Sequence, residues 1–167
     1  MSGRAYIGLW VGLAVFVIDQ VTKYIVVHAM DLKSLGAIDV LPPLLNFRMA
    51  WNQGINFGLF SDDGGAMRWI LICIAIMISA WVVWWIRREE AGFWARVSAG
   101  LLVGGALGNV VDRVLYGAVA DFLNMSCCGI DNPFAFNVAD ISIFAGAVGL
   151  ILFTGERKPR DAEGKSD

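Results

Sequence analysis

The chain has 167 residues, of which 57% are hydrophobic and only 17% are charged, and its mean hydropathy is +0.63. So few polar side chains cannot cover a water-soluble globule, and the composition therefore indicates an integral membrane protein. A net charge of −2 leaves no basic stripe to neutralise phosphates, which excludes a nucleic-acid partner.

The sequence also gives no sign of a metal or cofactor site. It contains three cysteines and the single histidine His28, with no Cys-x-x-Cys pair and no Cys/His cluster. Structural and catalytic zinc sites need such clusters, so we expect no metal ligands here.

Four stretches are long and apolar enough to be considered as transmembrane helices, because crossing a bilayer core takes about 20 apolar helical residues. Asp19 and Lys23 interrupt the first stretch, and no cleavage site follows it, so we interpret it as a retained helix and not a removed signal. The four predicted spans run from about 6 to 27, 67 to 86, 93 to 114 and 133 to 153.

Lysine and arginine cluster at one set of helix ends, which predicts the orientation of the spans. The ends assigned to the cytoplasm carry Arg4, Arg87, Arg88, Arg96, Arg157, Lys158, Arg160 and Lys165. Both termini are therefore predicted to be cytoplasmic, with a disordered tail over about 156–167.

The predicted external segment, about 30–66, is too long for a simple connector. It contains two β-prone pieces, Ala37–Leu41 and Leu44–Trp51, and then residues 56–60, which could form a short helix on the membrane surface. The predicted fold class is thus a mainly α membrane protein of one domain, with four transmembrane helices, a small external β platform and a surface helix.

The third span carries Gly100, Gly104 and Gly108 at four-residue spacing. Glycine at this spacing lets another helix backbone approach closely, and we interpret the repeat as a helix-packing groove.

Polar residues inside the spans all fall at a similar predicted depth. With a rise of about 1.5 Å per residue, they converge on the outer third of the membrane. Charged side chains facing lipid are costly, so these faces should turn inward to one polar cluster. The residues concerned are Asp19, Lys23, Asn109, Asp112, Arg113, Asn137 and Asp140, together with Asp121 in the connection before the last span.

Spacing alone leaves three interpretations of this cluster open. Two facing carboxylates, such as Asp121 and Asp140, can share one proton and divide the work of amide hydrolysis. The same carboxylates could instead relay protons in a small proton-coupled carrier. A non-catalytic membrane subunit is the third alternative, in which Asp19 with Lys23, and Asp112 with Arg113 or another basic partner, are structural ion pairs.

Five sequence blocks, in order, resemble those of the lipoprotein signal peptidase family, also called signal peptidase II. They are Asp19-Gln20-Val21-Thr22-Lys23, Trp51-Asn52-Gln53-Gly54, Gly108-Asn109-Val110-Val111-Asp112-Arg113, Val119-Ala120-Asp121-Phe122 and Phe136-Asn137-Val138-Ala139-Asp140. Ile55-Asn56 departs from the family, in which small residues are common at this point.

The resemblance implies a role for each matching residue. Asp121 and Asp140 would be the catalytic pair of an aspartyl endopeptidase. The supporting and substrate-binding residues would be Asn52, Gly54, Asn109, Arg113, Asn137, Asp19, Lys23 and Asp112. Asp112 would therefore support the site and not belong to the pair.

The resemblance also implies the setting of the reaction. The substrate would be a bacterial prolipoprotein, cleaved just before a cysteine that bears a diacylglyceryl group, and no cofactor would be needed. The enzyme would act in the inner membrane, among membrane lipid, with its site near the periplasmic face. Cyclic peptides such as globomycin would inhibit it, and a monomer is expected.

Overall fold

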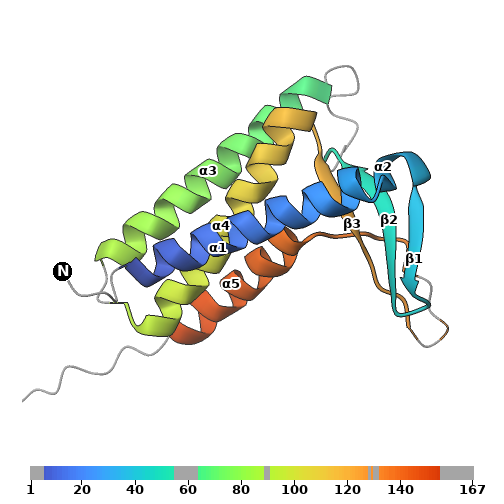
Figure 1. Ribbon diagram of the computed structural model, residues 1–167. Coiled ribbons are helices and arrows are strands. Elements are labelled where there is room, and N and C mark those ends of the chain that lie inside the picture. The colour runs from blue at the N-terminus through green and yellow to red at the C-terminus, as the bar shows by residue number, and fades with distance from the viewer. Residues whose placement is uncertain (1–5, 55–63, 89–90, 128, 130–131, 155–167) are drawn as a thin grey trace, which may run out of the picture.

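The computed structural model describes residues 6–54, 64–88, 91–127, 129 and 132–154. The long helices run side by side, and a small sheet projects from one end of the bundle (Figure 1). The helices are α1 (Ile7–Lys23), which continues as the wider π-helical η2 (Tyr24–Ala29), α3 (Gly64–Arg88), α4 (Phe93–Tyr116) and α5 (Val138–Thr154).

Three of these helices are long and apolar enough to cross a membrane, namely 7–29, 65–88 and 93–116. The fourth, α5, is apolar but has only 17 residues. Large apolar side chains lie on the outside of the bundle, for example Leu9, Met77 and Ile151, each more than half exposed. This pattern, apolar outside as well as inside, is that of a helical membrane protein.

Glycines bring α1 and α5 close to α4, as the glycine repeat of the third span predicted. A Cβ on Gly100 or Gly104 would collide with the backbone of α1 at Gly8 and Gly12. On another side of α4, a Cβ on Gly105 would lie 2.5 Å from the carbonyl oxygen of Ala139 in α5. The helix α4 is therefore the centre of the bundle, and small residues allow its neighbours to approach.

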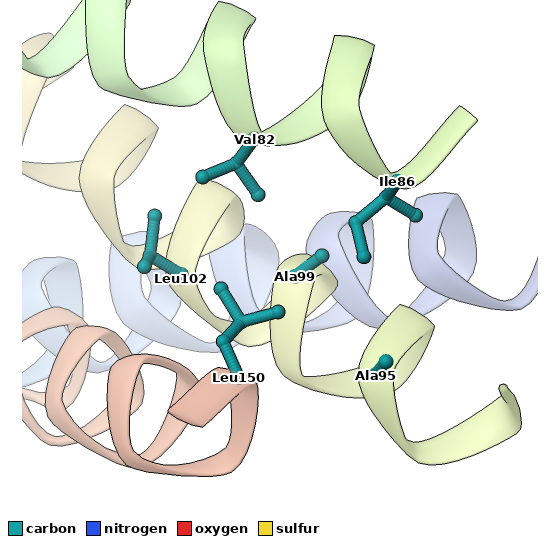
Figure 2. Close-up of a cluster of buried hydrophobic side chains, with 6 residues drawn as sticks. All are labelled: Val82, Ile86, Ala95, Ala99, Leu102 and Leu150. Atoms are coloured by element: carbon teal, nitrogen blue, oxygen red, sulfur yellow. The ribbon is translucent and has the colours of Figure 1, made fainter. Parts of the chain in front are cut away.

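Apolar packing fills the end of the bundle remote from the sheet. Figure 2 shows side chains of α3, α4 and α5 meeting there. The cluster consists of Val82, Ile86, Ala95, Ala99, Leu102 and Leu150.

The sheet has three antiparallel strands in the order β1-β2-β3. The first two, β1 (Ala37–Leu41) and β2 (Leu45–Asn52), form the predicted β platform, next to the short helix α2 (Leu32–Leu35). The third, β3 (Val119–Asn124), was not predicted, because this segment was interpreted as a connection between two spans. The register places Asp121 opposite Ala50 and Val119 opposite Asn52.

Alternation along β3 gives its residues two different environments. Ala120 and Phe122 are buried in an apolar cluster with Val26, Val27 and Leu32, beneath η2 and α2. Asp121, between them in sequence, projects from the opposite face of the strand. The apolar cluster thus fixes the position of β3, and the Asp121 carboxylate on the opposite face is directed towards the helices of the bundle.

Two boundaries differ from those expected from the sequence. The last helix begins at Val138 and not near Pro133, because residues before it pair with β3 through hydrogen bonds between Leu123 and Phe136. Helix α4 extends to Tyr116, two residues beyond the expected 114. The expected surface helix at 56–60 and the tail at 156–167 lie outside the described residues.

Candidate active site

Asn137 immediately precedes α5 and Asp140 lies in its first turn, and the two residues are hydrogen-bonded to each other. The Asn137 side-chain oxygen accepts a hydrogen bond from the main-chain N–H of Asp140 at 2.9 Å. In return, the Asp140 carboxylate accepts one from the main-chain N–H of Asn137 at 3.2 Å. This reciprocal arrangement is a capping box, and it fixes the Asp140 carboxylate at a helix N-terminus, where negative charge is stabilised.

Asp121 is brought to the same place by β3. Its Oδ1 accepts a hydrogen bond from Asn137 Nδ2 at 2.6 Å, and its Oδ2 accepts one from Asn52 Nδ2 at 3.0 Å. Asn137 therefore contacts both Asp121 and Asp140 and holds the two carboxyl groups on either side of itself. The pairing of Phe136 with Leu123 brings Asn137 beside the strand.

Burial dominates the electrostatics of Asp121, whose residue is only 3% exposed. Desolvation, together with the nearby charge of Asp140, raises the pKa of the Asp121 carboxyl from 3.8 to about 6. The hydrogen bonds from Asn52 and Asn137 oppose this rise in pKa. A carboxyl with such a pKa can hold a proton close to neutral pH and release it when required.

Asn109 and Arg113 approach the pair from α4. Asn109 Nδ2 donates to Asp140 Oδ1 at 2.9 Å, and its side-chain oxygen accepts from Asn137 Nδ2 at 3.3 Å. Arg113 donates from Nη1 to the carbonyl oxygen of Asn109 at 3.3 Å, while its buried Nε has no partner among the described residues. The arginine charge acts on both Asp140 and Asp121.

Behind the pair lies a buried ion cluster formed by Asp19, Lys23 and Asp112. The ammonium of Lys23 is 2.8 Å from Asp19 Oδ2 and 2.7 Å from Asp112 Oδ2. Lys23 also donates to the side-chain oxygen of Asn109 at 3.2 Å, which joins the cluster to the candidate site. The sequence left the partner of Asp112 open between Arg113 and another basic residue, and the structure places Lys23 there.

Gly54 shapes the loop that follows β2. Its φ of 93° lies in the region that favours glycine. In this conformation its N–H donates to the Asn52 side-chain oxygen at 3.0 Å, which leaves Asn52 Nδ2 directed at Asp121. A Cβ at Gly54 would also lie 2.6 Å from Leu71 Cδ1 in α3.

The structure gathers all ten residues selected from the sequence at the sheet end of the bundle. Sequence reasoning missed Gln20, whose Nε2 donates to both Asp19 Oδ2 and Asp112 Oδ1 at 3.2 Å. Its place inside the Asp19–Lys23 block was the available signal. Within the described part of the chain, no group of three or more His, Cys, Asp or Glu side chains is arranged to hold a metal ion.

Comparison with known proteins places this arrangement in a family. The chain is 40% identical to the lipoprotein signal peptidase of Methylorubrum extorquens (strain PA1), over 92% of this chain and 88% of that protein. It is 39% identical to the lipoprotein signal peptidase of Pseudomonas aeruginosa PAO1, over 86% and 85%.

Two solved structures, both described as a bacterial membrane enzyme, share the fold at 31% sequence identity. The first has a TM-score of 0.71 and covers 96% of this chain and 94% of its own, and the second has a TM-score of 0.75 and covers 90% and 94%. Residues 11–155 match the family described as Signal peptidase (SPase) II. The chain therefore belongs to the signal peptidase II family.

Proposed function

We propose that the protein is an aspartyl endopeptidase that removes the signal peptide from bacterial prolipoproteins. The observation that carries this proposal is the pair of carboxyl groups, Asp121 and Asp140, that Asn137 holds together in a chain of the signal peptidase II family. The bond cleaved would be the one before the diacylglyceryl-modified cysteine. Family membership favours this reading over the carrier and the structural subunit.

The two carboxyl groups divide the work of amide hydrolysis. Asp140, stabilised as an anion by the helix N-terminus and by Asn109, removes a proton from water as the water attacks the scissile carbonyl carbon. Asp121 donates its proton to the developing oxyanion. The proton taken by Asp140 then passes to the leaving amine as the C–N bond breaks, and one hydroxyl of the tetrahedral intermediate returns its proton to Asp121. The pair is thereby restored and needs no cofactor.

Burial favours the protonated form of Asp121, as the role of general acid requires. With a pKa of about 6, the free enzyme retains this proton only in mildly acidic solution. A lipid-bearing substrate that covers the site excludes more water, which disfavours the anion and raises the pKa of Asp121 further. Substrate binding and protonation of the pair therefore support each other.

Arg113, Asn52 and Gly54 would act on the substrate and on the pair. The Nε of Arg113, to which no other residue that the structure describes is hydrogen-bonded, is a candidate donor to a substrate carbonyl oxygen. Asn52 and Gly54 come from the β platform and set one wall of the site. Asn109 and Asn137 orient the two carboxylates, and Asp19, Lys23 and Asp112 support them from behind.

The depth of the site suits a substrate that arrives through the bilayer. Asn109 lies seven residues before the end of α4 at Tyr116, which is about 10 Å along the helix axis. With α5 as a fourth span and both termini cytoplasmic, the site would lie in the inner membrane just below its periplasmic face. Membrane lipid would surround a monomer, and cyclic peptides such as globomycin would occupy the site as inhibitors.

Cleavage of a purified diacylglyceryl-prolipoprotein by the detergent-solubilised protein tests the proposal, read as a mass shift of the substrate. We expect the wild type to cleave and the variants Asp121→Asn and Asp140→Asn to be inactive while folded. Asp39→Asn, at an exposed ion pair with Arg48, is the matched control and should cleave normally. Activity in either dyad variant would contradict the assignment, and an inactive but folded wild type would favour the carrier.

A further inference from the structure

Two buried carboxylates hold the main chain immediately before each member of the proposed catalytic pair. Asp19 Oδ1 accepts a hydrogen bond at 2.9 Å from the N–H of Ala139, the residue before Asp140. Asp112 Oδ2 accepts one at 3.2 Å from the N–H of Ala120, the residue before Asp121. The two main-chain segments belong to different elements, α5 and β3, and the same relation is found at both.

Lys23 joins the two carboxylates into one unit. Its ammonium lies 2.8 Å from Asp19 and 2.7 Å from Asp112, and its third contact is Asn109 at 3.2 Å. A lysine ammonium has three N–H donors, so all three have acceptors. Gln20 forms a second link, because its Nε2 donates to both carboxylates.

A displacement of Asp19 or Asp112 should be passed to the main chain, because the residues concerned are tightly packed. Asp19 and Ala139 are 0% exposed, Asp112 is 1% exposed and Ala120 is 2% exposed. Each held N–H belongs to the planar peptide that ends at the Cα of Ala120 or Ala139, and the regular backbone of β3 or α5 carries a shift of that peptide on to the next residue. The distance between Ala120 and Ala139 therefore constrains the distance between the carboxyl groups of Asp121 and Asp140.

We propose that Asp19, Lys23 and Asp112 form a main-chain clamp that sets the separation of the Asp121 and Asp140 carboxyl groups. This inference rests on the proposed function. The three are positioning residues, since they act through the main-chain N–H groups of Ala120 and Ala139. A buried ion cluster is a poor way to gain stability, because desolvation of its charges offsets their attraction. Fixing the geometry of the Asp121 and Asp140 carboxyl groups is a function for the cluster that does not depend on a gain in stability.

The alternative is that the ion cluster only stabilises the packing of α1 against α4. The pH profile of the reaction distinguishes this alternative from the clamp. Two interacting carboxyl groups titrate in two steps, and the gap between the steps grows as the groups approach each other. The width of the bell-shaped pH profile of kcat therefore reports the separation of the pair. Nearby charges such as Arg113 move both limbs together and change the width less.

Gly108→Ala and Gly8→Ala form a matched pair of tests. Both replace a glycine at the contact between α1 and α4. A Cβ at Gly108 would lie 2.5 Å from Asp19 Oδ2, in the clamp, whereas a Cβ at Gly8 would lie 2.8 Å from the carbonyl oxygen of Arg96, at the other end of the bundle. We expect Gly108→Ala to lower kcat about 100-fold, as a displacement of about 1 Å can do, with little change in KM and a narrower bell. Gly8→Ala should lower the melting temperature while keeping the wild-type kcat and width.

A charge-free variant tests the bridge itself, because Lys23→Met alone would leave two buried carboxylates unpaired and could fail to fold. Asp19→Asn/Lys23→Met/Asp112→Asn keeps a side-chain oxygen for each main-chain N–H but removes the bridge. We expect this triple variant to remain folded, with a reduced kcat and a bell narrower by about one pH unit, measured by substrate mass shift. If it fails to fold, the Gly108→Ala and Gly8→Ala pair decides.

The failure of the clamp differs from the failure of the proposed function. An inactive wild type or an active Asp121→Asn variant would overturn the function and the clamp with it. If wild type cleaves and Asp121→Asn does not, the clamp is overturned when folded clamp variants keep the wild-type kcat and bell width. It is also overturned when Gly8→Ala narrows the bell as much as Gly108→Ala.

Discussion

Replacing Asp121 by Asn should abolish cleavage and at the same time stabilise the folded protein above pH 6. Burial raises the pKa of Asp121 from 3.8 to about 6. The folded state therefore binds this proton more tightly than the unfolded chain, and ionisation disfavours folding as the pH rises through this window. About two pKa units correspond to about 3 kcal/mol, fully developed above pH 6 and absent below about pH 4.

The asparagine avoids this ionisation penalty but loses one contact. Asn52 Nδ2 would face an amide group in place of carboxylate oxygen, at a cost of about 1 kcal/mol. Asn137 would still donate to the side-chain oxygen at position 121. The net expectation at pH 8 is a gain of about 2 kcal/mol in the free energy of unfolding, which becomes a loss of about 1 kcal/mol at pH 4.

Reversible unfolding in mixed detergent micelles, followed by tryptophan fluorescence at pH 4 and pH 8, measures this difference. Asp39→Asn is the matched control, because its carboxylate is exposed and its ion pair with Arg48 lies at the surface. It should change the free energy of unfolding little at either pH. A difference for Asp121→Asn that is equal at both pH values, or a loss of stability at pH 8, would refute the reasoning from burial.

Three further predictions concern the same site and the bundle around it. Asn52→Ala should lower kcat by about 10 to 100-fold, since a donor that holds the Asp121 carboxyl is lost. It should also shift the alkaline limb of the pH–rate profile to higher pH, because this hydrogen bond lowers the pKa of Asp121; an unmoved limb would contradict this role of the bond. In the wild type, kcat/KM should begin to fall near pH 6, and kcat should begin to fall at a higher pH. Steady-state rates between pH 4 and pH 9 measure both alkaline limbs. If the two limbs coincide, substrate binding does not raise the pKa of Asp121 by desolvation. Gly104→Leu should prevent folding, because the side chain would enter the backbone of α1 at Gly12; a normal yield of monodisperse protein in detergent would contradict the observed packing.

The bundle was largely predictable because its signals are local. Long apolar runs give helices, and the glycine repeat of α4 shows which face meets another helix. The strand β3 was not predictable in the same way. Its polar residues, Asp121 and Asn124, are typical of a connection, and its strand character depends on pairing with β2, which is about 70 residues away in the sequence. The late start of α5 has the same origin, since Phe136 pairs with Leu123 before the helix begins.

The members of the candidate site could be found from the sequence, but their partners could not. Depth in the membrane places Asp19, Asn109 and Asp140 near one level, and their cost in lipid argues that they face inward. Which of two nearby cations meets Asp112 depends on how α1 rotates against α4, which the sequence does not encode locally. The structure shows that Lys23 takes this place, and within the described part of the chain the Nε of Arg113 has no partner.

The short last helix connects the fold to the depth of the reaction. Seventeen residues of α5 extend about 26 Å, whereas the 24 residues of α4 extend about 36 Å. Because α5 packs along α4, its N-terminus lies short of the sheet end of α4, and Asp140 near that N-terminus contacts Asn109 instead of Tyr116. An α5 that was longer at its N-terminus would move Asp140 along α4, away from Asn109. The capping box at Asn137 is therefore the feature that sets the depth of the proposed chemistry, because it ends the helix where a lipid-anchored substrate would present its scissile bond.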